Sequence, residues 1–562
     1  MPWTPRTESR NEAGCALGAS PRLPPMSPQT RSSAETARPR VRDGAVLVAA
    51  GIFLSRIVGL IRVRVFSHYF GLESDAADAF NAGFRIPNFL QNLFGEGALS
   101  ASFIPVYSRL LAEHDEKEAR HVAGAVAGLL ALTISIIVLV GVLASPVLID
   151  LIAPGFEGVK RELAVRLVRI LFPGAGLLVL SAWCLGILNS HHRFFVSYSA
   201  PVVWNLAMIG TLAAYGDRLG QVPLAVVLAW GSVAGSGLQV AVQLPTVVRL
   251  VGRLRPSIAI TSRHVRDVIR NFWPVFFSRG VVQISAYVDQ LIASLLPTGA
   301  VTGLTNAQIL YTLPVSLFGM SVSAAELPAM SRALGTDEAV ATQVRKRLES
   351  GLQQIAFFVV PSAVGFAALG DVIAGAILQT GRFRHTDAVY VWAILAGSAI
   401  GLLASTFARL YSSAYWALRD TRTPLQYAAV RVVLTATLGY LAAIPLPPLL
   451  GIEARWGVAG LSASAGLAGW VEFALLRRTL GRRIGPAIVP PSFLAKLWTA
   501  ALAGAGVGWG VKLALGPRSP LLVGGVVLTL YGLVFLGLTL LFRLPHARLT
   551  LARILTRPKP TS

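Results

Sequence analysis

Charged residues are scarce in this sequence, and acidic residues are the scarcest. Only 14% of the 562 residues are charged, with 27 Asp and Glu against 50 Lys and Arg, whereas soluble proteins carry about a quarter. The two cysteines, Cys15 and Cys184, lie in a polar and an apolar stretch respectively, which indicates neither a disulfide framework nor a metal site. These shortages, with 54% hydrophobic residues, exclude an ordinary soluble enzyme.

What the sequence has instead is a series of long apolar runs. Runs such as 122–149 and 521–542 exceed the roughly 20 residues that span a bilayer as a helix. The fold class expected is therefore an all-α polytopic membrane protein with about 14 transmembrane helices. We expect these helices near 44–66, 79–104, 122–149, 163–189, 195–216, 222–248, 269–297, 304–330, 351–379, 388–417, 424–446, 456–476, 495–515 and 520–542.

The excess of basic residues is best explained by membrane topology. A net charge of +23 would indicate nucleic-acid binding in a soluble protein, but here the arginines cluster in alternate short loops, so no nucleic acid is expected. Alternate loops with and without Lys and Arg place both termini in the cytoplasm, which requires an even number of spans. The basic set comprises Arg249, Arg253, Arg255, Arg263, Arg266, Arg345, Lys346, Arg347, Arg419, Arg422, Arg477, Arg478, Arg482 and Arg483.

The first 43 residues are rich in Pro, Ser and Arg and have no apolar core. They are unlike a secretory signal, and we expect a disordered cytoplasmic tail. Met26 is an alternative start within this tail.

Three landmarks recur at the same 223-residue offset, which indicates an internal repeat of six helices. The pairs are Ser55-Arg56 with Ser278-Arg279, the segment 105–111 with 328–334, and Pro201 with Pro424. Because six is even, both copies face the same way and are related by an axis along the membrane normal. We expect an N-terminal lobe at 44–250, a C-terminal lobe at 268–478, two extra helices at 494–543 and a cytoplasmic tail at 544–562.

Polar residues inside the expected spans are candidates for a site, because burying a charge in the bilayer is costly. The first helix holds Arg56 and Arg62. The second carries a stripe with steps of three and four, which places its members on one face: Asn81, Arg85, Asn88, Asn92 and Glu96. Arg279 on the seventh helix and Arg409 on the tenth belong to the second lobe.

Two interpretations of these residues stay open. The buried charges could pair and hold helices together, with Glu96 against an arginine of the first helix. Alternatively, surplus arginine lines a cavity between the lobes and binds an anion, because guanidinium suits bidentate contact with phosphate. Arg64 and Arg109 are expected to snorkel to the interface. The sequence has no HExxH or comparable spacing, so neither an enzyme, a metal site nor a cofactor is expected.

Several segments of the sequence resemble the MurJ (MviN) family of lipid II flippases. They are Ser55-Arg56-Ile-Val-Gly59-Leu-Ile-Arg62, Asp78-Ala-Phe80, Arg85-Ile-Pro87-Asn88, 94–105, Leu313-Pro314-Val-Ser-Leu-Phe-Gly319 and Asp420-Thr421-Arg422-Thr423-Pro424. The resemblance implies flipping of lipid II, an undecaprenyl-diphosphate-linked peptidoglycan precursor, from the inner to the outer leaflet of a bacterial inner membrane by alternating access. It also implies that the two extra helices help form a groove for the polyprenyl tail.

The resemblance places substrate-binding positions on Arg56, Arg62, Asp78, Arg85, Asn88 and Glu96, and we add Arg279. It also reveals departures, because Gln91 and Ile309 stand where the family often has arginine, and Val63 where it often has an acidic residue. Arg279 or Arg409 is our candidate for the missing charge. The expected partners are lipid II or a similar polyprenyl-diphosphate lipid and membrane lipids, and the expected state is a monomer.

Three other functions remain as alternatives. A multidrug exporter, or an exporter of another polyprenyl-linked glycan from the same superfamily, is the first of them, although an exporter of cationic drugs would want an acidic cavity. An enzyme acting on the same lipid would need a carboxylate on a long outer loop, and the loops here are short. A scaffold that transports nothing is the third.

Overall fold

The computed structural model describes residues 38–252, 257–258, 260, 262–333 and 336–555. The regular structure of these residues is helical, apart from one isolated bridge between Thr380 and Phe383. Residues 1–37 of the expected N-terminal tail lie outside the described part of the chain. Residues 38–43, which were predicted to belong to this tail, are helical in the structure.

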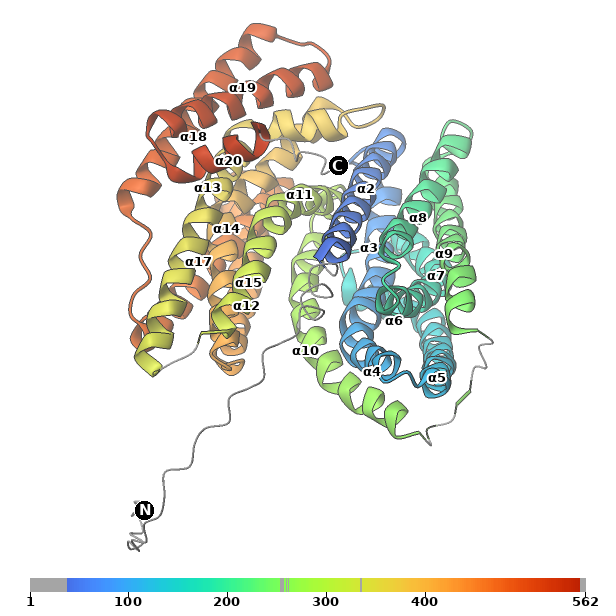
Figure 1. Cartoon of the computed structure of the whole chain (residues 1–562). Helices are drawn as coiled ribbons and strands as arrows, with labels where there is room; N and C mark the ends of the chain where they lie inside the picture. Colours follow the sequence, from blue (N-terminus) through green and yellow to red (C-terminus); the bar gives the residue numbers. More distant parts are fainter. Residues whose placement is uncertain (1–37, 253–256, 259, 261, 334–335, 556–562) are drawn as a thin grey trace, which may run out of the picture.

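Helices from the first half of the chain form one bundle, drawn from blue to green in Figure 1. In the order of the chain, its members are α2 (Arg38–Phe70), α3 (Asp75–Leu90), the π-helix η1 (Gln91–Leu99), α4 (Ser100–Ala112), α5 (Glu116–Leu143), α6 (Ser145–Ile152), α7 (Gly158–Ser190), α8 (Phe194–Tyr215) and α9 (Gln221–Val251). Within this bundle α7 packs against α3, α5 and α9, while α8 packs between α2 and α9.

A second bundle follows, and its first helix leans across to the first bundle (Figure 1). Its members are α10 (Arg263–Ser294), α11 (Ala300–Pro314), the π-helix η2 (Val315–Met320), α12 (Ser321–Ser331), α13 (Asp337–Leu378), α14 (His385–Ala417), α15 (Arg422–Ala443), α16 (Leu446–Leu449), the 3-10 helix η3 (Ala454–Trp456) and α17 (Gly457–Ile484). α10 contacts η1 and α4 as well as α15.

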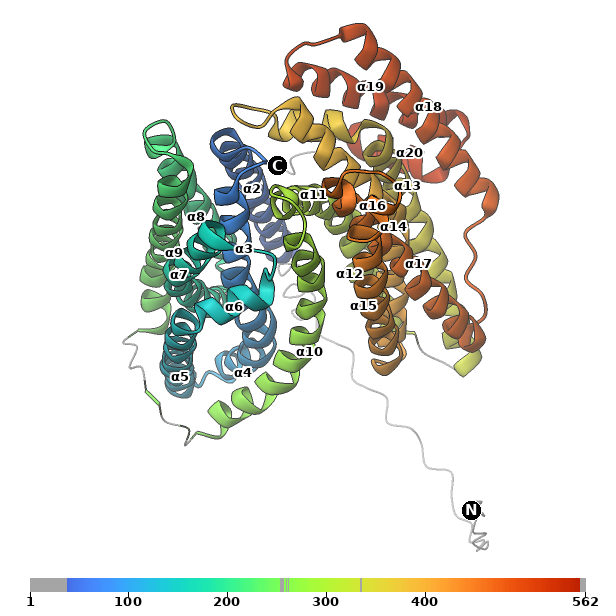
Figure 2. The same cartoon turned by 180° about the vertical axis from the view of Figure 1, so that it is seen from behind.

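The C-terminal helices lie outside both bundles. α18 (Pro491–Leu515) and α19 (Pro520–Leu541) pack against each other and against α13, as Figure 2 shows from behind. The segment expected to be only a cytoplasmic tail contains a further helix, α20 (Pro545–Leu555), in which His546 stacks against Phe357.

Ten helical segments of the described residues are long and apolar enough to cross a membrane. The chain is therefore an all-helical, multispanning membrane protein. The remaining four expected spans coincide with α2, with α3 through α4, with α10 and with α18. Three of these carry the polar residues predicted for the site, which lowers their hydropathy, so the total of fourteen stays a prediction.

The run 122–149 is not one helix, although its hydropathy predicts a single span. α5 ends at Leu143, and α6 begins after Ala144 with Pro146 in its first turn. Proline suits the start of a helix but removes a backbone donor from its interior. Hydropathy alone indicated one continuous span here because both segments are apolar.

Two π-helical segments occupy corresponding places in the expected repeat. η1 follows α3 in the first bundle, and η2 follows α11 in the second, close to the 223-residue offset found in the sequence. Each π-segment adds a residue to the helical turn, and such segments are frequent at functional sites. Both segments adjoin helices that border the pocket described next.

Close helix packing in the second bundle depends on glycine. A Cβ atom on Gly401 of α14 would stand 2.3 Å from the Cα atom of Gly466 on α17. Only a residue without a side chain permits this approach, as is common between transmembrane helices.

Candidate functional site: a basic pocket between the bundles

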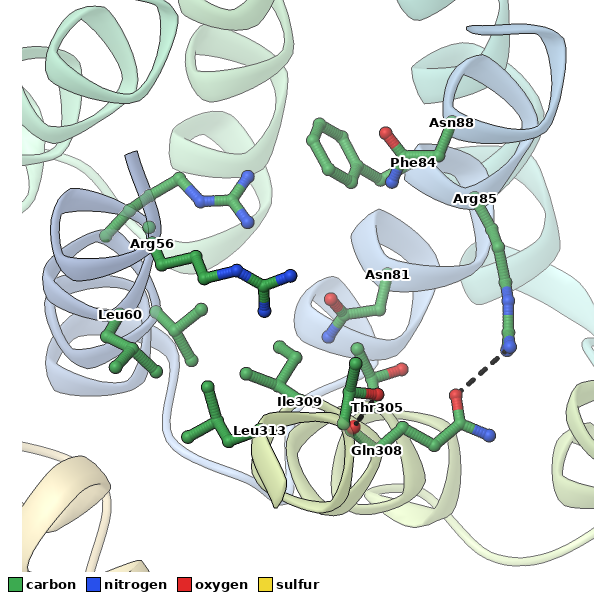
Figure 3. A pocket seen from close by; sticks show the side chains of 14 residues that line it. Arg56, Leu60, Asn81, Phe84, Arg85, Asn88, Thr305, Gln308, Ile309 and Leu313 are labelled. Atoms are coloured by element: carbon green, nitrogen blue, oxygen red, sulfur yellow. Dashed lines mark hydrogen bonds between the residues drawn. The ribbon is translucent and has the colours of Figure 1, made fainter. Parts of the chain in front are cut away.

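A cavity of about 370 Å³ lies between α2 and α3 of the first bundle and α11 of the second. Figure 3 shows side chains from these three helices pointing into it. Within the described part of the chain, its lining includes three arginines and no acidic residue: Arg56, Gly59, Leu60, Arg62, Val63, Asn81, Phe84, Arg85, Asn88, Thr305, Gln308, Ile309, Thr312 and Leu313. Four predicted substrate-binding residues, Arg56, Arg62, Arg85 and Asn88, are thus brought together.

Arg56 reaches across the pocket from one bundle to the other. Its guanidinium donates a hydrogen bond of 3.0 Å to the hydroxyl of Ser316 on η2, and the side chain is exposed. A single hydrogen bond to a neutral group in an exposed setting contributes only about 1 kcal/mol. An anion entering the pocket can therefore replace Ser316 as the partner of Arg56.

Arg62 is held by aromatic faces. Its guanidinium carbon lies 5.3 Å from the ring centroids of both Phe84 and Trp204, and it donates to the sulfur of Met208 at 3.5 Å. None of the ion pairs among the described residues involves Arg62. Cation–π contacts orient a guanidinium without neutralising it, so Arg62 keeps its positive charge beside the pocket.

Arg85 is positioned by amides of the second bundle. It donates to the side-chain oxygen of Gln290 at 2.7 Å and to that of Gln308 at 3.1 Å, the second contact being visible in Figure 3. Its guanidinium also lies 5.7 Å from the ring of Tyr287, whose hydroxyl donates to the Arg85 carbonyl. Asp289 is within electrostatic reach.

The lining of the pocket shows where the residues that differ from the family pattern lie. Ile309 borders the pocket, so its position is one from which an arginine would reach the cavity. Its neighbour Gln308 instead holds Arg85, and Gln91 is not among the lining residues. Arg409 does not line the pocket either, and Arg431 pairs with Glu472 at 3.2 Å.

Asp78, which was predicted to bind substrate, lies outside the pocket. Its buried carboxylate accepts hydrogen bonds from the Gly299 N–H, the Thr302 N–H and the Thr302 hydroxyl, at 2.9, 2.9 and 2.7 Å. The Nζ atom of Lys160 lies 2.9 Å from the same carboxylate and forms an ion pair with it. The carboxylate faces the N-terminus of α11, where orphan amides and the helix dipole favour a negative charge. We call these four residues the interbundle joint.

Further contacts between the bundles surround this joint. Arg455 pairs with Glu73 at 2.9 Å, and the Nδ1 atom of His68 lies 2.9 Å from the hydroxyl of Thr380. The Arg382 N–H donates to the His68 carbonyl at 2.9 Å. This end of the pocket is therefore fastened by several independent contacts.

The prediction that Arg64 snorkels to the interface was wrong. Its guanidinium donates to the carbonyls of Ala376 and Ile377 at 2.8 and 2.9 Å. These carbonyls belong to the last turn of α13, which attracts cations. Arg64 thus joins the two bundles from a position that sequence alone made look like a lipid anchor.

The side chains of two predicted site residues, Glu96 and Arg279, lie outside the described residues. Their assignments remain predictions. Two residues that contribute to the site or its support, Gln308 and Lys160, could not be singled out from sequence, where charges inside apolar spans were the main signal. Gln308 is uncharged, and Lys160 lies at the start of a helix.

Among the described residues, no cluster of three His, Cys, Asp or Glu side chains is suited to hold a metal. Two helical bundles around a basic cavity, fastened together at one end, define a membrane transporter of the two-lobe class. Solved structures support this class of fold: a lipid II flippase MurJ in an inward closed conformation has a TM-score of 0.72, with 24% identity over 89% of this chain and 99% of its own. An inward-facing multidrug resistance transporter of the MATE family has a TM-score of 0.61, with 17% identity over 78% of this chain and 98% of its own.

Sequence comparisons identify the family within that class. The model of the lipid II flippase MurJ family matches residues 66–532. A probable lipid II flippase MurJ of Rhizobium meliloti is 31% identical over 76% of this chain and 78% of its own length. One from Rhizobium tropici is 31% identical over 78% and 80%. The chain belongs to the MurJ family of lipid II flippases.

Proposed function

We propose that this chain moves lipid II from the inner to the outer leaflet of a bacterial inner membrane by alternating access. The observation that carries this proposal is the pair Arg56 and Arg62, which face one cavity without a carboxylate among its described lining residues. A pocket with surplus guanidinium groups attracts a diphosphate. The family membership specifies which diphosphate lipid this is.

The contacts around the pocket suggest how an anion is recognised. Arg56 exchanges its weak bond with Ser316 for a phosphate oxygen, while Arg62 is already oriented by its two aromatic neighbours. Asn88 supplies an amide donor on the α3 side. A charge-assisted bond to phosphate is about twice as strong as a neutral hydrogen bond.

Arg85 links substrate binding to movement of the bundles. Its guanidinium is held by Gln290 and Gln308 of the second bundle. A phosphate that draws Arg85 away removes contacts between the bundles. Binding therefore favours the state in which these contacts are open, as differential affinity requires.

Alternating access needs one end of the pocket shut while the other admits substrate. Because the basic loops favour cytoplasmic termini, the interbundle joint lies on the outer side. The two lobes, 44–250 and 268–478, rock against each other about this joint. In the present state the joint holds the outer side closed.

A second cavity is suited to the polyprenyl tail. It has a volume of about 290 Å³, lies between α11, η2, α13 and α19, and shares Leu313 with the basic pocket. Its lining is almost wholly apolar, including Phe318, Phe366 and Leu528. A tail placed here passes beside the extra helices while its diphosphate reaches the arginines. Such a carrier acts as a monomer and performs no covalent chemistry.

A multidrug exporter is the second candidate, since the MATE transporter shares the fold. A pocket for cationic drugs would need acidic lining residues, and the described lining residues of this pocket are basic or neutral. We therefore favour the anionic lipid.

The test is replacement of the resident flippase in a depletion strain. We expect the chain to restore growth and outer-leaflet lipid II labelling. Arg56→Ala and Arg62→Ala should each abolish rescue at unchanged expression. The exposed loop residue Arg218 provides a control, and Arg218→Ala should rescue fully. Good expression without rescue by the unmodified chain would refute lipid II as the substrate.

A further inference from the structure

The seam between α5 and α10 contains a groove that the proposed function has not used. Two cavities, of about 670 and 330 Å³, lie along this seam. The larger is bordered by α3, α5, α6, α7 and α10, and the smaller by η1, α5 and α10. Ile137 lines both, so we treat them as one surface and call it the seam groove.

The seam groove is nearly as long as a bilayer is thick. On α5 and the residue that follows it, the lining runs from Val126 to Ala144, which at 1.5 Å per residue is about 27 Å. The hydrocarbon core of a bilayer is about 30 Å. Apart from Thr133, Trp273 and Tyr287, the described lining is apolar. A long hydrocarbon chain can therefore lie in it at any depth without burying a polar group.

The groove adjoins the basic pocket through one residue. Tyr287 lines the groove, while its hydroxyl donates to the carbonyl of Arg85 at 3.1 Å. The Arg85 guanidinium, which borders the pocket, lies 5.7 Å from the same ring. A molecule with a chain in the groove thus has its head close to the arginines of the pocket.

The first turns of α10, at the level of the smaller cavity, carry three basic residues. Arg263, Arg266 and Arg270 are exposed on the first turns of α10, beside the groove residues Val268 and Ile269. Clustered basic residues at the cytoplasmic face attract anionic lipid headgroups. Charge and apolar length together fit an amphiphile with an anionic head and a long tail.

We propose that the seam groove binds the polyprenyl chain of the substrate while its diphosphate passes between the three arginines and the basic pocket. This inference rests on the proposed function, because the occupant is the lipid that the pocket moves. Among the described residues, the groove shares no lining side chain with the cavity beside α19. It is therefore a second tail site, and its depth lets the chain pass between the leaflets.

The first experiment fills the groove. Ile137→Trp places an indole where the two cavities meet, whereas Leu139→Trp adds the same group to a lipid-facing position that is 60% exposed and lines neither cavity. In proteoliposomes we expect Ile137→Trp to slow lipid II flipping at least tenfold and Leu139→Trp to change it less than twofold. Equal rates for the two variants would overturn the proposal.

The second experiment detects the occupant directly and does not require transport. A benzophenone side chain is introduced at Val140, which lines the groove, or at Leu143, which is 71% exposed and does not. The protein is placed in phosphatidylethanolamine and phosphatidylglycerol vesicles containing undecaprenyl diphosphate. After irradiation, adducts at position 140 should be enriched in the polyprenyl lipid at least fivefold over its mole fraction, and adducts at 143 should follow the mole fraction.

The outcomes separate this proposal from the proposed function. Phospholipid adducts at both positions in proportion to abundance would mean that ordinary acyl chains fill the groove, which overturns the inference. Arginine variants that stop flipping would still support the function in that case. Conversely, polyprenyl enrichment at position 140 with normal flipping by Arg56→Ala and Arg62→Ala would uphold the groove and reject the headgroup assignment.

Discussion

At the scale of single residues, Asp78 and the pocket arginines differ in the partners that their charged groups contact. Asp78 has four hydrogen-bond or ionic contacts in the interbundle joint, whereas Arg62 has aromatic rings and a thioether. A carboxylate whose oxygens already accept several hydrogen bonds stabilises the contact between the bundles. A charge that has no counter-ion within the described part of the chain is available to a ligand.

Replacing Asp78 should open the outer end of the pocket. In Asp78→Ala, Lys160 and the start of α11 lose a buried charged partner, at a cost of about 3–5 kcal/mol for a broken buried pair. We expect a cysteine at Thr305 to react faster with an impermeant maleimide added from outside. The exposed loop residue Asp217 supplies the control variant Asp217→Ala. Unchanged labelling in Asp78→Ala would contradict the role given to the joint.

Asp420, in the loop between α14 and α15, should make stability depend on pH in the acid range. Burial raises the pKa of this carboxyl, but the Thr423 N–H, the Thr423 hydroxyl and Arg483 outweigh it and lower the pKa to about 2. Because the folded pKa lies below the usual 3.8, this contribution is full above about pH 4 and is lost as pH falls toward 2.

The measurement is thermal unfolding in detergent between about pH 6 and pH 2.5. Asp420→Asn should be less stable than the unmodified chain at pH 6, by about 1 kcal/mol, because solvent screens a charge near the surface. The difference should shrink as the pH is lowered. A difference that is constant over this range would show that the carboxylate charge is not what matters.

At the scale of helices, hydropathy and charge were enough to place most spans. They failed where two apolar segments adjoin, as at Pro146, and where a polar segment still folds as a helix, as in α20. Mean hydropathy indicates whether a segment lies in lipid or in water, but it does not indicate whether the helix is continuous. A hydropathy average over a window does not detect a proline in a short connection. It also does not detect a polar helix that follows the last span.

Packing of α14 against α17 should not tolerate a side chain at Gly401. Gly401→Leu forces apart two helices whose glycines nearly touch, and overpacking typically costs about 1–3 kcal/mol or more. We expect a clear fall in the midpoint of thermal unfolding. A Cβ atom on Gly469 of α17 would meet only open space within the described part of the chain, so Gly469→Ala should leave the midpoint nearly unchanged. Equal effects would contradict the close approach.

At the scale of the whole molecule, the sequence predicted three arginines that border the pocket but not the contacts that hold the bundles together. Arg56, Arg62, Arg85 and Asn88 were found because charges and amides in apolar spans are conspicuous. The joint between Asp78, Lys160 and the start of α11 could not be found in this way. Its members are distant in the sequence and become neighbours only when the two bundles meet.

Flipping by purified protein measures the central claim most directly. The chain is reconstituted in vesicles with fluorescent lipid II, and a membrane-impermeant quencher reports the fraction that has changed leaflet. The account predicts transfer by the unmodified chain, transfer by Arg218→Ala at a similar rate, and loss of at least about 90% of the rate in Arg62→Ala, because tenfold corresponds to only about 1.4 kcal/mol of lost binding. Transfer by Arg62→Ala at the rate of the unmodified chain would contradict the claim that surplus guanidinium in this pocket carries the diphosphate.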